Sequence, residues 1–182
     1  MTKSSLQKVL IIGYGNPARE DDGLGPAFAE ALEQCGIIDV TIESNYQLTV
    51  EDAAAVADHD VVIFIDSSVD GEKPFSFTHL FPKPMDSFTS HSVGPETVLC
   101  LARELFGAVT KGYMLCIRGY SFAMFKETMT EKASENLKKT FDFLIPVLRS
   151  QSFHEAAHYD EKEQTVSREG KHEKWEICDF MY

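Results

Sequence analysis

Short apolar runs and longer amphipathic stretches follow one another along the chain. Residues 9–12 and 61–65 are continuous apolar runs, which are typical of parallel strands covered on both faces. Residues 40–44 and 75–81 alternate between apolar and polar positions, and the second of these stretches suits a more exposed or edge strand. A further strand is expected over residues 111–118. The pattern therefore predicts strands separated by polar or helical segments.

Helical periodicity occupies most of the stretches between the strands. Helices are predicted over residues 23–34, 50–58, 96–106 and 130–150. Thr49 and Thr130 are the expected N-caps of the second and fourth helices, and Pro146 is expected to end or kink the fourth. The inward face of the third helix is expected to hold Val98, Leu99, Ala102, Leu105 and Phe106. This alternation predicts an α/β fold, a three-layer doubly wound domain with a mostly parallel twisted sheet flanked by helices.

The domain is predicted to span residues 1–150. Residues 151–182 differ in composition, because they carry eight acidic residues, four Lys or Arg and three His, with few aliphatic residues. We interpret them as a charged C-terminal tail.

Charge and cysteine usage limit the partners and the compartment. The formal net charge of −12 makes nucleic acid or an anionic membrane surface an unfavourable partner. The apolar run near the N-terminus is too short for a signal sequence, and no stretch approaches a membrane span. The four cysteines show no CxxC spacing, which is typical of reduced cysteines in a cytoplasmic protein.

The first strand leads into an acidic, glycine-rich loop, residues 13–25, with the sequence GYGNPAREDDGLG. Gly13, Gly15 and Ala18 formally satisfy a dinucleotide-binding GxGxxG/A motif. The loop is longer than that motif needs, and three consecutive carboxylates would lie where a pyrophosphate must bind. The acids could instead cap the following helix, or at least one could be a metal ligand; the loop alone favours neither.

Two further polar residues follow other elements. Asp66 comes directly after the apolar run 61–65, and His91 lies in a polar loop just before the third helix. Each residue also has an ordinary structural explanation: Asp66 could cap a turn, and His91 could be a surface histidine. If the first and third strands are neighbours, Asp22, Asp66 and His91 can converge at the carboxyl end of the sheet. Two carboxylates and an imidazole suit a divalent transition metal with open positions.

These motifs resemble those of the hydrogenase maturation endopeptidases. In that family a strand is followed by Gly-x-Gly-Asn, a short spacer and Asp-Asp/Glu-Gly-x-Gly, which residues 13–16 and 21–25 match. The family's three metal ligands fall on Asp22, Asp66 and His91. The resemblance covers residues 8–150, but Ser-Asn-Tyr-Gln-Leu-Thr at 44–49 replaces a Gly-Thr-x-Gly type loop. This departure concerns which hydrogenase is served.

The resemblance implies an endopeptidase that removes the C-terminal extension of a nickel–iron hydrogenase large-subunit precursor. Nickel would arrive on the precursor, so that only the nickel-loaded form is recognised. Glu20 or Asp21 could act as a base, although solvated capping acids are the plainer expectation. Arg118 could pair with a peptide carboxyl group or form a structural ion pair.

Two other classes of function stay open. His154-Glu-Ala-Ala-His158 in the tail is a formal HExxH motif, which on a helix would bind zinc in a different class of metallopeptidase. However, the chain offers no supporting subdomain for a third ligand. The other class is a non-catalytic adaptor that docks a basic partner on its acidic face.

Overall fold

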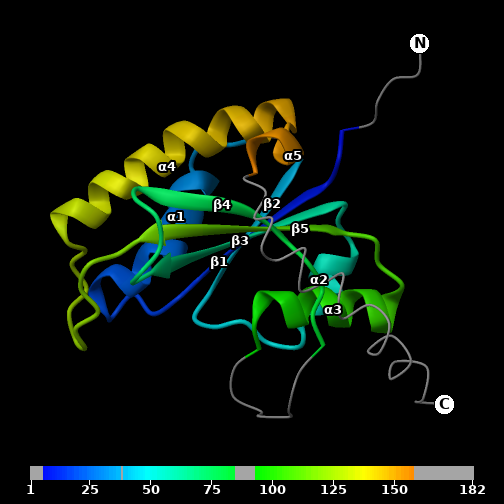
Figure 1. Ribbon diagram of the computed structural model, residues 1–182, viewed down its shortest axis with the longest axis horizontal. Helices are drawn as coiled ribbons and strands as arrows, with labels where there is room; N and C mark the ends of the chain where they lie inside the picture. The colour runs from blue at the N-terminus through cyan, green and yellow to red at the C-terminus, as the bar shows by residue number, and fades with distance from the viewer. Residues whose placement is uncertain (1–5, 38, 85–92, 158–182) are drawn as a thin grey trace.

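The computed structural model describes residues 6–37, 39–84 and 93–157. It contains a five-stranded sheet in the order β2-β1-β3-β5-β4 (Figure 1). The strands are β1 (Val9–Tyr14), β2 (Val40–Asn45), β3 (Val61–Ser68), β4 (Phe75–Leu80) and β5 (Lys111–Arg118). Four strands are parallel, and β4 is an antiparallel edge strand paired with β5. The predicted central position of residues 61–65 and the edge position of 75–81 are confirmed.

Helices cover both faces of this sheet (Figure 1). The helices are η1 (Glu20–Gly23), α1 (Leu24–Glu33), α2 (Asp52–Ala57), α3 (Pro95–Phe106), α4 (Glu131–Ser150) and α5 (Phe153–Ala156). α1 and α4 contact each other on one face, and α2 and α3 contact each other on the opposite face. The predicted doubly wound α/β architecture is therefore confirmed. None of the described helices is long and apolar enough to cross a membrane.

The continuous apolar strands supply side chains to two separate hydrophobic cores. Val9 and Ile11 of β1 pack under α1 and α4, whereas Leu10 and Ile12 pack under α2 and α3. All four are at most 1% exposed, and residues 61–65 of β3 are completely buried in the same alternating manner. A strand with a helix on each face needs no polar positions, which is why these runs are uninterrupted.

Two helix details differ from the sequence prediction, and α4 runs to Ser150 as its predicted range 130–150 indicated. Thr49 does not cap α2; instead its N–H donates to the Asp52 carboxylate at 2.6 Å, and the helix begins at Asp52. Leu105 and Phe106 are 67% and 56% exposed, because α3 ends at Phe106 and Gly107 takes the left-handed conformation that terminates it. Pro146 does not end α4, which continues to Ser150.

Both ends of α4 are fixed by specific contacts. Thr130 is its N-cap, as predicted, and its hydroxyl accepts a hydrogen bond from the Ala133 N–H at 3.3 Å. After the helix, Gln151 exchanges two hydrogen bonds with the backbone of Gln7, and Phe153 is 2% exposed within the core under α4. Packed structure therefore continues past residue 150 to α5, and residues 158–182 lie outside the described part of the chain.

Candidate active site at the carboxyl end of the sheet

The pairing of β1 with β3 brings two of the three predicted ligands together. Gly13 of β1 is the partner of Ile65 of β3, so the loop after β1 and the residues after Ile65 share one edge of the sheet. Asp22 lies in η1, and its Oδ1 accepts a hydrogen bond from the Ser67 hydroxyl at 3.5 Å. Asp66 lies inside β3, next to that serine. His91 lies outside the described residues, so its place in the site stays a prediction.

The glycines of the acidic loop allow it to lie directly against the sheet. A Cβ on Gly13 would collide with the carbonyl of Gly25, and a Cβ on Gly25 would collide with the carbonyls of Tyr14 and Ile65. Gly15 has a φ of 137°, which side-chain-bearing residues rarely adopt. Close packing of α1 against β1 and β3 therefore explains the glycine pattern without a dinucleotide.

Asp66 is a carboxyl group with an unusual environment. Burial, together with the nearby charge of Asp22, raises the pKa of Asp66 to about 6, although its own backbone neighbour Ser67 donates a hydrogen bond at 2.7 Å. The Tyr14 hydroxyl also hydrogen-bonds to Asp66, and burial and this carboxylate raise the pKa of Tyr14 far above its usual value. Burial and the charge of Asp66 raise the pKa of the Cys116 thiol to about 11.

This electrostatic arrangement fits a cation. Two carboxylates share a partly buried edge, and the neighbouring phenol and thiol are held in their neutral forms. A divalent cation would relieve the repulsion between the carboxylates, and carboxylate oxygens are suitable ligands for one. In residues 6–37, 39–84 and 93–157, no three His, Cys, Asp or Glu side chains form a cluster that could hold a metal ion, so Asp22 and Asp66 by themselves do not make a three-ligand site.

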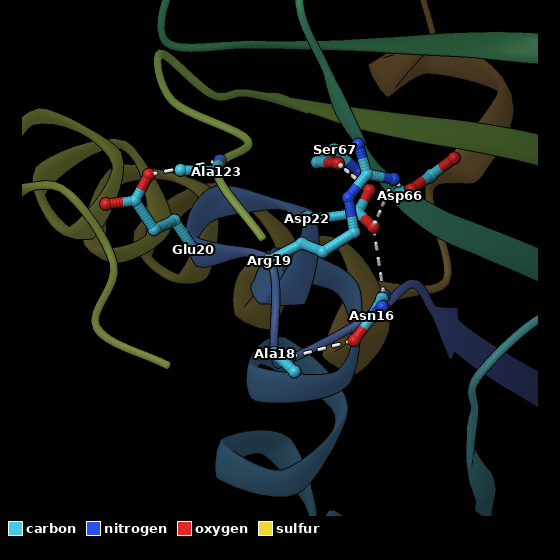
Figure 2. A network of polar contacts seen from close by, with 8 residues as sticks. All are labelled: Asn16, Ala18, Arg19, Glu20, Asp22, Asp66, Ser67 and Ala123. Carbon is cyan, nitrogen blue, oxygen red and sulfur yellow. Dashed lines mark hydrogen bonds and ion pairs between the residues drawn. The ribbon is translucent and has the colours of Figure 1, made fainter. Parts of the chain in front are cut away.

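Arg19 is part of this site, and the sequence analysis did not identify it. Figure 2 shows its guanidinium extending toward the carboxylate of Asp22, and Nη1 lies 3.5 Å from Asp22 Oδ2. The same oxygen accepts the Asn16 N–H at 3.3 Å. Nε of Arg19 is buried and has no hydrogen-bond partner among the described residues. The positively charged guanidinium of Arg19 therefore lies beside the Asp22 carboxylate, where a bound metal ion would otherwise be.

Arg19→Gln is expected to increase the affinity of the protein for Cd²⁺ or Ni²⁺ up to about fivefold, because the Arg19–Asp22 ion pair no longer competes with the metal. Isothermal titration at low ionic strength measures the change. Arg103→Gln is the matched control, since Arg103 pairs with Glu104 at 3.0 Å on α3, away from the site. Equal affinities in wild type and Arg19→Gln would show that Arg19 does not compete with the metal.

Glu20 and Asp21 are not solvated capping acids, and this expectation was wrong. Asp21 is completely buried, and its carboxylate accepts hydrogen bonds from the Thr130 N–H at 2.7 Å, the Tyr120 N–H at 2.7 Å and the Ser121 N–H at 3.1 Å. The Thr130 hydroxyl donates a fourth, at 2.8 Å. Asp21 therefore ties the acidic loop to residues 119–130.

Glu20 holds the same segment at a second point. Its carboxylate accepts a hydrogen bond from the Ala123 N–H, which Figure 2 shows, and another from the Ser121 hydroxyl. Lys126 Nζ lies 3.4 Å from Glu20 Oε1. The hydrogen bond from Ser121 is the main reason that the pKa of Glu20 lies below its usual value. A carboxylate with this many donors is a structural anchor and a poor proton acceptor.

Arg118 also has a different role from the expected ion pair. Its Nη1 donates to the Gly71 carbonyl at 3.3 Å, and its guanidinium carbon lies 5.7 Å from the centre of the Tyr120 ring. Within the described chain it forms no ion pair.

The tail motif does not form the helix that a zinc site needs. α5 ends at Ala156, and Ala157 has an extended backbone, so the helical spacing of the HExxH motif is interrupted. The ring of His154 lies 4.9 Å from that of His79 on β4. His158 lies outside the described residues.

Comparisons with solved structures identify the fold. The chain matches the [NiFe] hydrogenase maturation protease HycI from Thermococcus kodakarensis KOD1 with a TM-score of 0.63 and 22% identity, covering 80% of this chain and 95% of that one. It matches the hydrogenase maturating endopeptidase HybD from E. coli with a TM-score of 0.59 and 20% identity, covering 79% and 93%. A hydrogenase 2 maturation peptidase from Thaumarchaeota archaeon SCGC_AB-539-E09 gives a TM-score of 0.56 and 22% identity, covering 78% and 97%.

No protein-family model and no curated protein matches the sequence. The structural likenesses nevertheless show that the chain has the fold of the hydrogenase maturation proteases, which is the family that its loop motifs resemble. The matched structures are covered almost completely, so the likeness extends over their whole domain.

Proposed function

We propose that this protein is an endopeptidase that removes the C-terminal extension of a nickel–iron hydrogenase large-subunit precursor after nickel has been inserted. The observation that carries the proposal is the pair Asp22 and Asp66, held together at the carboxyl end of the sheet in a fold shared with maturation proteases. Asp21 is completely buried and accepts four hydrogen bonds of 3.1 Å or less, whereas the contacts of the Asp22 carboxylate with Asn16, Arg19 and Ser67 are 3.3 to 3.5 Å long.

Nickel enters this reaction as part of the substrate. Asp22 and Asp66 provide oxygen ligands to the nickel of the precursor, and His91 provides an imidazole nitrogen as the third ligand. Binding the metal places the adjoining polypeptide of the precursor against the loop after β1. If the precursor is recognised through its nickel, a metal-free precursor should be left intact.

The chemistry itself is the addition of water across one peptide bond. The oxygen of the water forms a bond to the carbonyl carbon, the carbon–nitrogen bond breaks, and the leaving nitrogen gains a proton. Before the nickel of the precursor binds, burial and the charge of Asp22 raise the pKa of Asp66 to about 6, whereas hydrogen bonds lower the pKa of Glu20 and of Asp21.

The proposal predicts that the protein shortens a nickel-loaded precursor and leaves the nickel-free precursor unchanged. Both forms of a large-subunit precursor are incubated with the protein, and mass spectrometry detects the released peptide. Cleavage of both forms at equal rates contradicts recognition through nickel, and cleavage of neither contradicts the proposed activity.

A metal titration separates this site from the tail motif. Wild type, Asp22→Ala, His91→Ala and His158→Ala are titrated with Ni²⁺ and Cd²⁺. Binding that is lost in the first two variants and kept in the third supports the site at the sheet edge. Loss confined to His158→Ala assigns the metal to the tail and contradicts the proposed ligand set.

A further inference from the structure

A basic cleft lies beside the candidate active site. It has a volume of about 430 Å³ and is lined by Lys73, Pro74, Tyr120, Lys132, Glu135, Asn136 and Lys139. One wall is the segment that precedes β4, and the other is the N-terminal half of α4. On α4, the lining residues recur at helical spacing, so that Lys132, Asn136 and Lys139 lie on one face of the helix.

Positive charge exceeds negative charge in this cleft, because three lysines and one glutamate line it. Lys73 Nζ and Lys132 Nζ each lie 5.8 Å from the centre of the Tyr120 ring, and the guanidinium of Arg118 lies 5.7 Å from it. None of the three lysines of the cleft forms an ion pair within the described residues. Glu135 is the only carboxylate that lines the cleft among the residues that the structure describes.

A group of lysines is unexpected on a protein with this overall composition. The chain has 29 acidic residues against 17 Lys and Arg, so an average surface region should be acidic. Lysines that outnumber the acidic residues around them repel one another, and this repulsion is relieved when an anionic partner binds.

The walls of the cleft are rigidly connected to the acidic loop. The Tyr120 N–H donates to Asp21, the residue that precedes Asp22. Asn136 Nδ2 donates to the Tyr120 hydroxyl at 3.1 Å and to the Arg118 carbonyl at 2.9 Å, and the Arg118 N–H donates to the Pro74 carbonyl at 3.1 Å. The cleft and the carboxylate pair are thus fixed relative to each other at one end of the sheet, where α4 begins (Figure 1).

We propose that the cleft formed by Lys73, Lys132 and Lys139 around Tyr120 binds an acidic segment of the precursor polypeptide while Asp22 and Asp66 hold its nickel. This inference rests on the proposed function and adds a second contact with the same substrate. The two contacts have opposite charge: the carboxylates receive a cation, and the lysines receive carboxylates.

The shape and chemistry of the cleft fit a polypeptide better than a small phosphate compound. The cleft is open, and its lysines come from both walls, Lys73 from the segment before β4 and Lys132 and Lys139 from α4. The amide of Asn136 already donates to Tyr120 and Arg118, so it is not a free donor for a phosphate oxygen. Tyr120 is 37% exposed, and its ring offers a surface for the aliphatic parts of a bound chain.

The test is the double variant Lys132→Glu/Lys139→Glu in the processing of a nickel-loaded precursor. We expect KM to rise about tenfold while kcat stays unchanged. The reason is that two attractive contacts become repulsive, far from the bond that is cleaved. The difference from wild type should shrink as NaCl is raised toward about 0.5 M, since salt screens exposed charges. Lys138→Glu is the matched control, because Lys138 is an exposed residue of α4 that does not line the cleft.

The outcomes separate this inference from the proposed function. If wild type processes the precursor and the double variant has an unchanged KM, the cleft does not bind the substrate, and the proposed activity stands. An equal rise in KM for Lys138→Glu also overturns the inference, because net charge alone would then explain the effect. If wild type does not process the precursor, the proposed function fails, and this inference fails with it. Melting curves of each variant establish that it is folded at the assay temperature.

Discussion

Asp22→Asn and Asp66→Asn are each expected to lower the rate of precursor processing at least about a hundredfold, with the fold retained. Each change replaces a charged oxygen ligand with a neutral amide of the same shape. The amide loses the electrostatic attraction to nickel. Processing rates measured by mass spectrometry on the nickel-loaded precursor give the comparison with wild type.

The matched control is Asp70→Asn, which makes the same substitution at an exposed carboxylate in the turn after β3. It should process the precursor at the wild-type rate. Wild-type rates for Asp22→Asn or Asp66→Asn would show that the carboxylate pair is not the catalytic site.

A stability measurement on Asp66→Asn separates loss of function from loss of fold. The raised pKa of Asp66, about 6, means that the charged form is less favourable in the folded protein than in the unfolded chain. Removing the charge should therefore stabilise the protein at pH 7, by on the order of 1 to 2 kcal/mol. The gain should decline as the pH falls from 6 toward 4, because the wild-type carboxyl group then becomes neutral in the folded state.

The central strands of this fold could be predicted from the sequence because a strand that is buried on both faces consists of apolar residues. Residues 9–12 and 61–65 contain no polar residue, and each strand is covered on both faces. Exposed ends are less determined by pattern: Leu105 and Phe106 continue the helical periodicity of α3, but the helix has passed the sheet by that point.

The candidate site was predictable only as far as strand order could be inferred. Asp22 and Asp66 follow strands that are neighbours, so their proximity follows from the doubly wound topology. The direction of the Arg19 side chain depends on the turn at residues 16–19, where the Ala18 N–H donates to Asn16 Oδ1 at 2.9 Å and the Arg19 N–H donates to the Asn16 carbonyl. Hydrophobic periodicity carries no information about such a turn.

The role of Asp21 could not be inferred from the sequence at all. Its four hydrogen-bond donors belong to Tyr120, Ser121 and Thr130, about a hundred positions along the chain. Two consecutive aspartates thus lie in different surroundings: Asp21 is completely buried and holds a loop, and Asp22 is partly exposed at the sheet edge beside Arg19.

Asp21→Asn is expected to lower the free energy of unfolding at pH 7 by about 3 kcal/mol. The amide keeps one acceptor oxygen, but its NH₂ group faces donors, so some of the N–H groups of Tyr120, Ser121 and Thr130 lose their partner without reaching water. Chemical denaturation of wild type and variant measures the loss. Asp70→Asn, at an exposed carboxylate in the turn after β3, is the control and should change the free energy of unfolding by less than about 0.5 kcal/mol.

The pH dependence identifies the carboxylate as the cause. Burial alone would raise the pKa of Asp21, but the hydrogen bonds from Thr130, Tyr120 and Ser121 outweigh it and lower the pKa below its usual value. A lowered pKa contributes stability above about pH 4, and this contribution is lost as the pH falls through the folded-state pKa. The difference between wild type and Asp21→Asn should therefore shrink in acid. A difference that is constant from pH 7 to pH 3, or unchanged hydrogen exchange at residues 120, 121 and 130 in the variant, would show that Asp21 does not anchor the loop.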